Sequence, residues 1–134
     1  MGLIVDTCIF IAAERQEHSP NLAACQPYEH AYISVITVSE LLIGVHRANT
    51  KARRLRRSAF AETILAEMPI LHFTTEAARL HSELYAHLAD KGFLIGAHDL
   101  IIAATALVHD YAILTTNKHE FKRVPGLKVL DYGV

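Results

Sequence analysis

Short apolar segments alternate with helical patterns along this chain, and that alternation constrains the fold more than any other feature. Residues 3–5 (Leu-Ile-Val) are continuously apolar, which is typical of a central strand in a parallel sheet. Further strands are expected at residues 31–34, 70–73 and 112–115, with an edge-like strand at 127–130. The pattern predicts one α/β domain over residues 1–134, with a mostly parallel, doubly wound sheet of four to five strands flanked by helices.

The intervening helices are predicted from apolar residues spaced three and four positions apart and from signals at the helix ends. Thr37 is expected to cap one helix, in a capping box with Glu40, and Thr50 to cap a basic helix that runs to about residue 67. Helices are also expected at residues 8–13, near 21–25, from 75 to the stop at Gly92, and at 95–107. The polar residues 116–120 are expected to form a turn.

Composition excludes several classes of protein. A hydrophobic fraction of 51% is too high for a disordered tail or a basic arm, and a net charge of −1 leaves nucleic-acid binding to a local patch. Cys8 and Cys25 form no CxxC pair, so free thiols in a reducing compartment are expected. No signal peptide is apparent, and no apolar run approaches the roughly 20 residues that span a bilayer. We therefore expect a cytoplasmic domain without a membrane segment.

Acidic and amide side chains recur where the predicted strands end or the following helices begin. Asp6 ends the first strand, Glu40 starts the helix after the second, and Asp99 lies in the first turn of the helix at 95–107. Asn117 and Glu120 follow the fourth strand. Asp99 alone also fits a carboxylate stabilised by the helix dipole. Together, however, the five residues are predicted to meet at one edge of a doubly wound sheet.

Several carboxylates in one crevice repel each other and stay ionised when a cation compensates them. Their oxygen ligands favour Mg²⁺ or Mn²⁺ over Zn²⁺. Such an ion can bind a phosphate oxygen and lower the pKa of a bound water. Thr7 and Thr115 are expected to orient carboxylates or hold waters, and Asn117 adds a neutral donor and acceptor.

Four ordered motifs carry a resemblance that spans nearly the whole chain. They are LIVDT, ISVITVSELLIGV, GAHDLIIAATAL and LTTNKHEF followed by VPGL. Together they resemble a PIN domain and, more narrowly, the VapC-type toxins of bacterial toxin–antitoxin pairs. The resemblance implies a Mg²⁺- or Mn²⁺-dependent endoribonuclease that hydrolyses RNA phosphodiester bonds through an activated water.

The resemblance also assigns residues. It makes Asp6 the first family acid, Glu40 the second and Asp99 the third. Thr115 matches the Ser or Thr that ends the fourth strand. Some members place the fourth acid where Asn117 stands, and others three residues later, where this chain has Glu120. The implied catalytic set is Asp6, Glu40, Asp99 and Glu120. Asp6 and Asp99 are the expected metal ligands, with Glu40 and Glu120 as further candidates, and one tight metal site is favoured over two.

Partners follow from the resemblance and from one basic segment. The family implies a homodimer and a small antitoxin whose C-terminal segment covers the acidic crevice. Arg47, Lys51, Arg54 and Arg57 are candidates for contacts with RNA phosphates or with the antitoxin, and a solvated helix face is the competing interpretation. His98 adjoins Asp99, but no catalytic role is expected for it, because a metal-bound water needs no histidine base.

Two other functions compete with the ribonuclease. A phosphatase-like fold would use the aspartate after the first strand as a nucleophile, but that class usually has a second aspartate where Cys8 stands. A catalytically silent PIN-like module that binds RNA or a protein partner is the alternative outside enzymes. Binding RNA alone would favour basic groups at the rim, whereas this chain places Asp6, Glu40 and Asp99 there.

Overall fold

The computed structural model describes residues 2–16 and 30–132, and its centre is a five-stranded sheet in the order β3-β2-β1-β4-β5. The strands are β1 (Gly2–Val5), β2 (His30–Ser34), β3 (Ile70–Leu71), β4 (Ala112–Thr115) and β5 (Val129–Asp131). All four strand pairings are parallel, which confirms the predicted fold class. The helix expected near 21–25, together with Cys25, lies outside the described residues.

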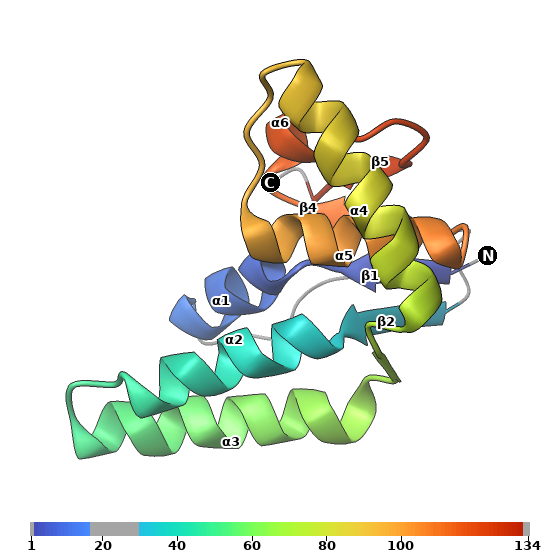
Figure 1. Cartoon of the computed structure of the whole chain (residues 1–134). Helices are drawn as coiled ribbons and strands as arrows, with labels where there is room; N and C mark the ends of the chain where they lie inside the picture. Colours follow the sequence, from blue (N-terminus) through green and yellow to red (C-terminus); the bar gives the residue numbers. More distant parts are fainter. Residues whose placement is uncertain (1, 17–29, 133–134) are drawn as a thin grey trace.

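Helices cover both faces of the sheet (Figure 1). In the described residues they are α1 (Thr7–Arg15), α2 (Val35–His46), α3 (Lys51–Glu67), α4 (Thr75–Asp90), α5 (Ala97–Val108) and α6 (Lys118–Phe121). Side chains alternate along β1, so Leu3 and Val5 pack with α1, α2 and α3, whereas Ile4 packs with α4, α5 and α6. The sheet therefore separates two apolar cores, as doubly winding predicts. No helix of the described part is both long and apolar enough to cross a membrane.

The strand order reverses at β1, which lies between β2 and β4. The chain therefore leaves the carboxyl ends of these neighbouring parallel strands in different directions, which opens a crevice there. β1 ends at Val5, β2 at Ser34 and β4 at Thr115. The residues that follow these three positions form the rim of that crevice.

The ends of the helices confirm some capping predictions and correct one. Thr50 caps α3 by accepting a hydrogen bond from the Arg53 N–H at 3.1 Å, as expected. Thr37, however, does not cap α2. Ser34 does so, accepting from the Ile36 N–H at 3.1 Å, because α2 begins immediately after β2. Thr37 therefore lies within the helix and is completely buried. Gly92 follows α4 with φ of +72°, as the predicted stop requires.

Three short elements also differ from their predicted extents. β3 ends at Leu71 rather than 73, because its partner β2 ends at Ser34, which pairs with Leu71. β5 is shifted to Val129–Asp131, in register with β4. The expected turn at 116–120 contains the one-turn helix α6, which the fully buried Phe121 anchors in the core that it shares with α5.

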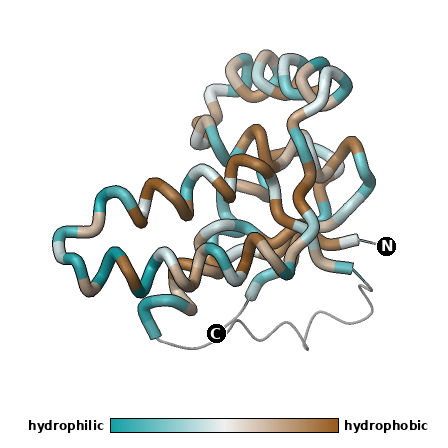
Figure 2. The backbone as a smooth tube through the Cα atoms, turned by 90° about the horizontal axis from the view of Figure 1, so that it is seen from below, coloured by the Kyte–Doolittle hydropathy of each residue, from teal (hydrophilic) through white to brown (hydrophobic). Residues whose placement is uncertain are grey.

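Helices α2 and α3 pack side by side as a hairpin that extends away from the sheet (Figure 1). The far end of this hairpin is hydrophilic, as Figure 2 shows, and the basic first turns of α3 lie there. Leu55 and Ile43 remain exposed on it, at 62% and 46% of their surface. The hairpin thus presents basic and apolar side chains on a surface that the rest of the domain leaves exposed.

Candidate functional site

Asp6 lies at the carboxyl end of β1 and caps α1. Its Oδ1 accepts the Thr7 N–H at 2.8 Å, and its Oδ2 accepts the Thr115 hydroxyl at 2.8 Å and the Cys8 thiol at 3.2 Å. The side chain is almost completely buried, which raises its pKa; the hydrogen bonds from Thr115, Cys8 and Thr7 oppose that rise. β1 and β4 are adjacent strands, so Thr115 reaches this carboxylate directly.

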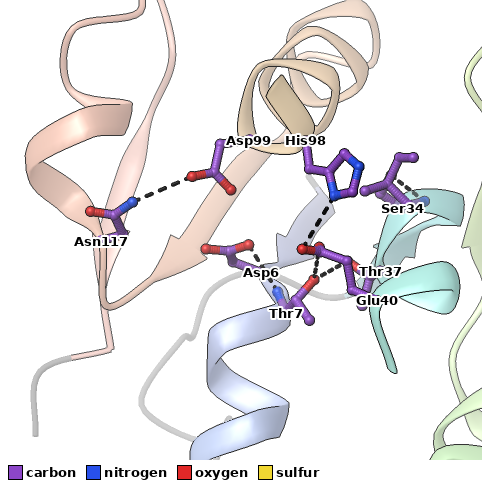
Figure 3. A network of polar contacts seen from close by, with 9 residues as sticks. Asp6, Thr7, Ser34, Thr37, Glu40, His98, Asp99 and Asn117 are labelled. Atoms are coloured by element: carbon purple, nitrogen blue, oxygen red, sulfur yellow. Dashed lines mark hydrogen bonds and ion pairs between the residues drawn. The ribbon is translucent and has the colours of Figure 1, made fainter. Parts of the chain in front are cut away.

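Glu40 approaches the same crevice from α2. Because α2 begins at Val35, Glu40 lies in its second turn, not at its start as the sequence suggested. Its Oε1 accepts the Thr7 hydroxyl at 2.7 Å, and its Oε2 lies 3.4 Å from Nδ1 of the half-exposed His98 (Figure 3). Thr7 therefore contacts both Asp6 and Glu40.

Asp99, Asn117 and Glu120 form the other half of the rim. Asp99 is in the first turn of α5, Asn117 precedes α6, and Glu120 is in α6. The Asn117 amide donates to Glu120 Oε2 at 2.9 Å and to Asp99 Oδ2 at 3.4 Å. The two positions at which the fourth acid was expected are thus neighbours, with the amide joining the two carboxylates.

Burial raises the pKa of Asp99 to about 7, with further contributions from the charge of Asp6, a hydrogen bond with Glu120 and the charges of Glu120 and Glu40. Each cause is burial or another acid, so no positive charge of the described residues compensates Asp99. The structure therefore brings the predicted Asp6, Glu40 and Glu120 within electrostatic range of Asp99, and Glu40 within range of Asp6.

The donor set at the rim consists of carboxylate, hydroxyl and amide oxygens, which is the chemistry that Mg²⁺ and Mn²⁺ prefer. Among the described residues, no three His, Cys, Asp or Glu side chains already form a closed metal cluster. Asp6, Glu40 and Asp99 lie around a common space instead (Figure 3), so rotation of their side chains would be needed to close them on an ion. The crowded, uncompensated charge fits such an ion.

Three residues at the rim, Cys8, His98 and Thr37, make contacts that were not anticipated from the sequence. Cys8 bonds to Asp6 Oδ2 and also accepts the Thr116 hydroxyl at 3.2 Å. His98 faces Glu40, although its neighbour Asp99 faces the opposite half of the rim. Thr37 lies 2.8 Å from the Thr7 hydroxyl. The available signals were the positions of Cys8 two residues after Asp6 and of His98 beside Asp99.

The four basic candidates are divided by the structure. Arg47 follows the last residue of α2 and Lys51 begins α3, and both are exposed at the far end of the hairpin. Arg54 donates to the Ala48 carbonyl at 3.4 Å, and Arg57 to the Gly44 carbonyl at 2.9 Å. Arg54 and Arg57 thus help to join α3 to α2, and they are not simply solvated charges.

A cavity of about 160 Å³ lies between α1, α2 and α3, beside the rim. Its lining includes Glu40 and Arg57 and the side chains or backbone of Phe10, Ile11, Leu41, Gly44 and Phe60. A Cβ added at Gly44 would meet no atom within 4 Å, so the fold itself does not require glycine there. Glu40 therefore belongs both to the acidic rim and to the wall of this mostly apolar groove.

The parallel sheet, its switch point and the acids gathered there define a class of nuclease-like α/β domains. The PIN domain model matches residues 3–127, and the chain belongs to the PIN domain family. Among its relatives are ribonucleases named VapC. Ribonuclease VapC1 of Rickettsia felis is 43% identical over 97% of this chain and 96% of its own. The tRNA(fMet)-specific endonuclease VapC of Salmonella typhimurium is 31% identical over the same shares.

Solved structures give the same picture. The chain resembles one in VapBC2 of Rickettsia felis, bound to a DNA fragment from its promoter, with a TM-score of 0.88 and 26% identity. That match covers 99% of this chain and 100% of the other. It also resembles one in DNA-bound VapBC of Salmonella typhimurium, with a TM-score of 0.86, 26% identity and 99% coverage of both chains.

Proposed function

We propose that this protein is a Mg²⁺- or Mn²⁺-dependent endoribonuclease and the toxin of a toxin–antitoxin pair. The observation that carries the proposal is the gathering of Asp6, Glu40, Asp99 and Glu120 from four separate segments at the switch point of the sheet. Relatives named ribonuclease or endonuclease, which match nearly the whole chain, support the choice of RNA as the substrate.

Asp6 and Asp99 are the residues that would hold the ion, with Glu40 and Glu120 as further ligands. A bound Mg²⁺ or Mn²⁺ would supply positive charge for the phosphate and acidity for the attacking water. The chain's own groups prepare that site: Thr7 and Thr115 hold Asp6, Thr7 also holds Glu40, and Asn117 holds Glu120.

The test is a cleavage assay on purified protein with RNA, with and without Mg²⁺ and with a chelator. We expect cleavage in Mg²⁺, none in chelator, and none from Asp99→Asn. Glu83→Gln, which changes an exposed acid on α4, is the matched control and should cleave like the parent. Cleavage that persists in chelator, or in folded Asp99→Asn, would contradict the metal assignment.

The same assay distinguishes the silent module. A catalytically inactive RNA-binding protein would bind RNA without cutting it. The RNA would then stay intact with and without Mg²⁺, in the parent protein and in Asp99→Asn alike. The crowding that raises the pKa of Asp99 disfavours this function, because uncompensated carboxylates at the rim repel phosphate.

The antitoxin is proposed to occupy the groove between α1, α2 and α3. Solved relatives are VapBC toxin–antitoxin complexes, and this groove is apolar, opens beside Glu40 and contains Gly44, which the fold does not require. Glycine within a helix costs about 1 kcal/mol relative to alanine. Gly44→Ala should therefore stabilise the isolated protein but weaken its complex with the purified product of a neighbouring reading frame. Unchanged affinity would place the partner elsewhere.

A homodimer is also proposed. Tyr85 and Leu94 are exposed to 63% and 83% around the end of α4, next to the half-exposed Phe93. Contiguous exposed apolar groups of this kind often mark protein interfaces. Sedimentation should show a dimer at micromolar concentration, and a monomer there would contradict the proposal.

A further inference from the structure

Thr37 carries a buried hydroxyl that the fold does not need for capping. Ser34 caps α2, and Thr37 lies fully buried within the helix. Its Oγ1 is 2.8 Å from Oγ1 of Thr7, which stands 30 positions earlier at the start of α1. A buried hydroxyl that lacks a partner costs free energy, so this contact is what makes a threonine acceptable here.

The direction of the hydrogen bonds follows from the number of protons. The Thr7 hydroxyl has one hydrogen, which it donates to Glu40 Oε1 at 2.7 Å. In the contact between the two threonines Thr37 must then be the donor. The order is Thr37 to Thr7 to Glu40 (Figure 3).

Thr7 is the point at which two acids of the rim are joined. Its backbone N–H donates to Asp6 Oδ1 at 2.8 Å and is fixed by the start of α1. Its hydroxyl, in contrast, can rotate about the Cβ–Oγ1 bond. The Thr37 hydrogen bond restricts that rotation and keeps the Thr7 hydrogen directed at Glu40.

We propose that Thr37 is a positioning residue that holds the Glu40 carboxylate in place beside Asp6 through the Thr7 hydroxyl. The proposal rests on the proposed function, since it concerns the orientation of a proposed metal ligand. Among the described residues, the other Glu40 oxygen contacts His98 alone, which is half-exposed and 3.4 Å away, so the oxygen bonded to Thr7 is the better-fixed one.

The experiment compares Thr37→Val, which keeps the shape and removes the hydroxyl, with Thr37→Ser, which keeps the hydroxyl. Mn²⁺ binding is measured by calorimetry without RNA, and kcat and KM are measured with RNA. Because a neutral hydrogen bond contributes about 0.5–1.5 kcal/mol, Thr37→Val should weaken Mn²⁺ binding and lower kcat by about threefold to tenfold. KM for RNA should stay within about twofold of the parent value. Thr37→Ser should restore both the Mn²⁺ affinity and kcat.

Thr105→Val is the matched control, because Thr105 is also a buried helical threonine, but its hydroxyl bonds to the Ile101 carbonyl away from the rim. It should leave Mn²⁺ binding and kcat unchanged. Thr7→Val should reproduce the loss, and adding Thr37→Val to it should cause no further loss, since the two hydroxyls act in series.

Each outcome supports or overturns the positioning role. Mn²⁺ binding and kcat within twofold of the parent in Thr37→Val would overturn the proposal, as would a Thr37→Ser protein equally impaired, which would indicate packing alone. Additive losses with Thr7→Val would also overturn it. If Thr37→Val does not fold, Thr37→Ala takes its place. A parent protein that neither binds Mn²⁺ nor cleaves RNA would instead refute the proposed function, and the positioning role with it.

Discussion

The two halves of the acidic rim are held in different ways. On the side of Asp6 and Glu40, all four carboxylate oxygens have a partner, supplied by Thr7, Thr115, Cys8 and His98. On the side of Asp99 and Glu120, the donor that serves both acids within the described part of the chain is the Asn117 amide, with a contact of 3.4 Å to Asp99, and the two acids also share a hydrogen bond.

The two halves therefore differ in what they lack. The carboxylates of Asp6 and Glu40 are already fixed in direction, whereas Asp99 lacks a compensating charge among the described residues. Donors that bond to an ionised carboxylate stabilise it and fix its direction, so the half with Asp6 and Glu40 is organised in advance. The pKa of Asp99 is raised to about 7, so near neutral pH a bound cation would favour the ionised form of this acid. We expect substitutions in the two halves to have similar effects on cleavage but different effects on stability.

The largest expected effect is on catalysis. Asp6→Asn and Asp99→Asn should each lower metal-dependent RNA cleavage by about a thousandfold or more, because each removes a proposed ligand of the ion. Without metal, Asp99→Asn should raise Tm by about 3 °C more than Asp6→Asn, a difference of about 1 kcal/mol for a chain of this size. Asp6→Asn gains less because it disturbs three hydrogen bonds.

Cleavage assays and thermal melts in chelator measure both effects, with circular dichroism as the check on folding. A rise in Tm for Asp6→Asn equal to or larger than that for Asp99→Asn would show that the two halves do not differ as described.

A smaller effect is expected from adding charge to the weakly held half. Asn117→Asp removes the amide that joins Asp99 and Glu120 and places a third carboxylate beside them. Tm in chelator should fall by about 3 °C, and Mn²⁺ should raise it more than in the parent. Asn49→Asp, at the exposed end of α2 and α3, is the control for added charge. Equal responses of the two variants to Mn²⁺ would contradict the comparison.

The stability of the metal-free protein should also depend on pH. The folded-state pKa of Asp99, about 7, is above the ordinary value of 3.8, so the folded protein binds the proton more tightly than the unfolded chain does. The stabilising contribution is complete below about pH 4 and is lost as the pH rises through about 7. Urea denaturation in chelator should show this decline, and Asp99→Asn should flatten it. Identical pH profiles would be the contradicting result.

The smallest effect is expected away from the rim. Replacing Arg54 and Arg57 by Gln should weaken RNA binding and lower the slope of log affinity against log salt by roughly 0.7 for each phosphate that the protein no longer neutralises. Binding is measured in the Asp99→Asn background, with the exposed Arg79→Gln on α4 as control. An unchanged slope would leave these arginines the role seen in the structure, which is to bond the carbonyls of Gly44 and Ala48 at the end of α2.

The order of strands and helices was predictable because their apolar patterns are strong, and the place of the acids followed from the topology of parallel sheets. The residue at which α2 begins was not predictable, because Ser34 and Thr37 are both good capping residues. The end of β2 decides between them. The one-turn helix α6 depends on burial of Phe121, a tertiary contact.

The contacts within the rim were harder to predict for a different reason. Successive residues of a helix point about 100° apart, so an error of one residue in a helix start redirects every side chain. The contacts of His98 with Glu40 and of Thr37 with Thr7 were therefore not predicted. All four residues nevertheless lie within the motifs that carry the family resemblance. Sequence located the acids and indicated Thr7 and Thr115 beside them, but not the contacts of Cys8, Thr37 and His98.

The most direct test of the central claim is the number of protons released when Mn²⁺ binds, measured by calorimetry in buffers of different ionisation enthalpy. If the ion replaces a proton on the Asp99 side of the rim, binding at about pH 6 should release close to one proton, and release should fall toward zero by about pH 8.5. Asp99→Asn should abolish this release. Binding that releases no proton at about pH 6, or release that persists unchanged in Asp99→Asn, would contradict the account.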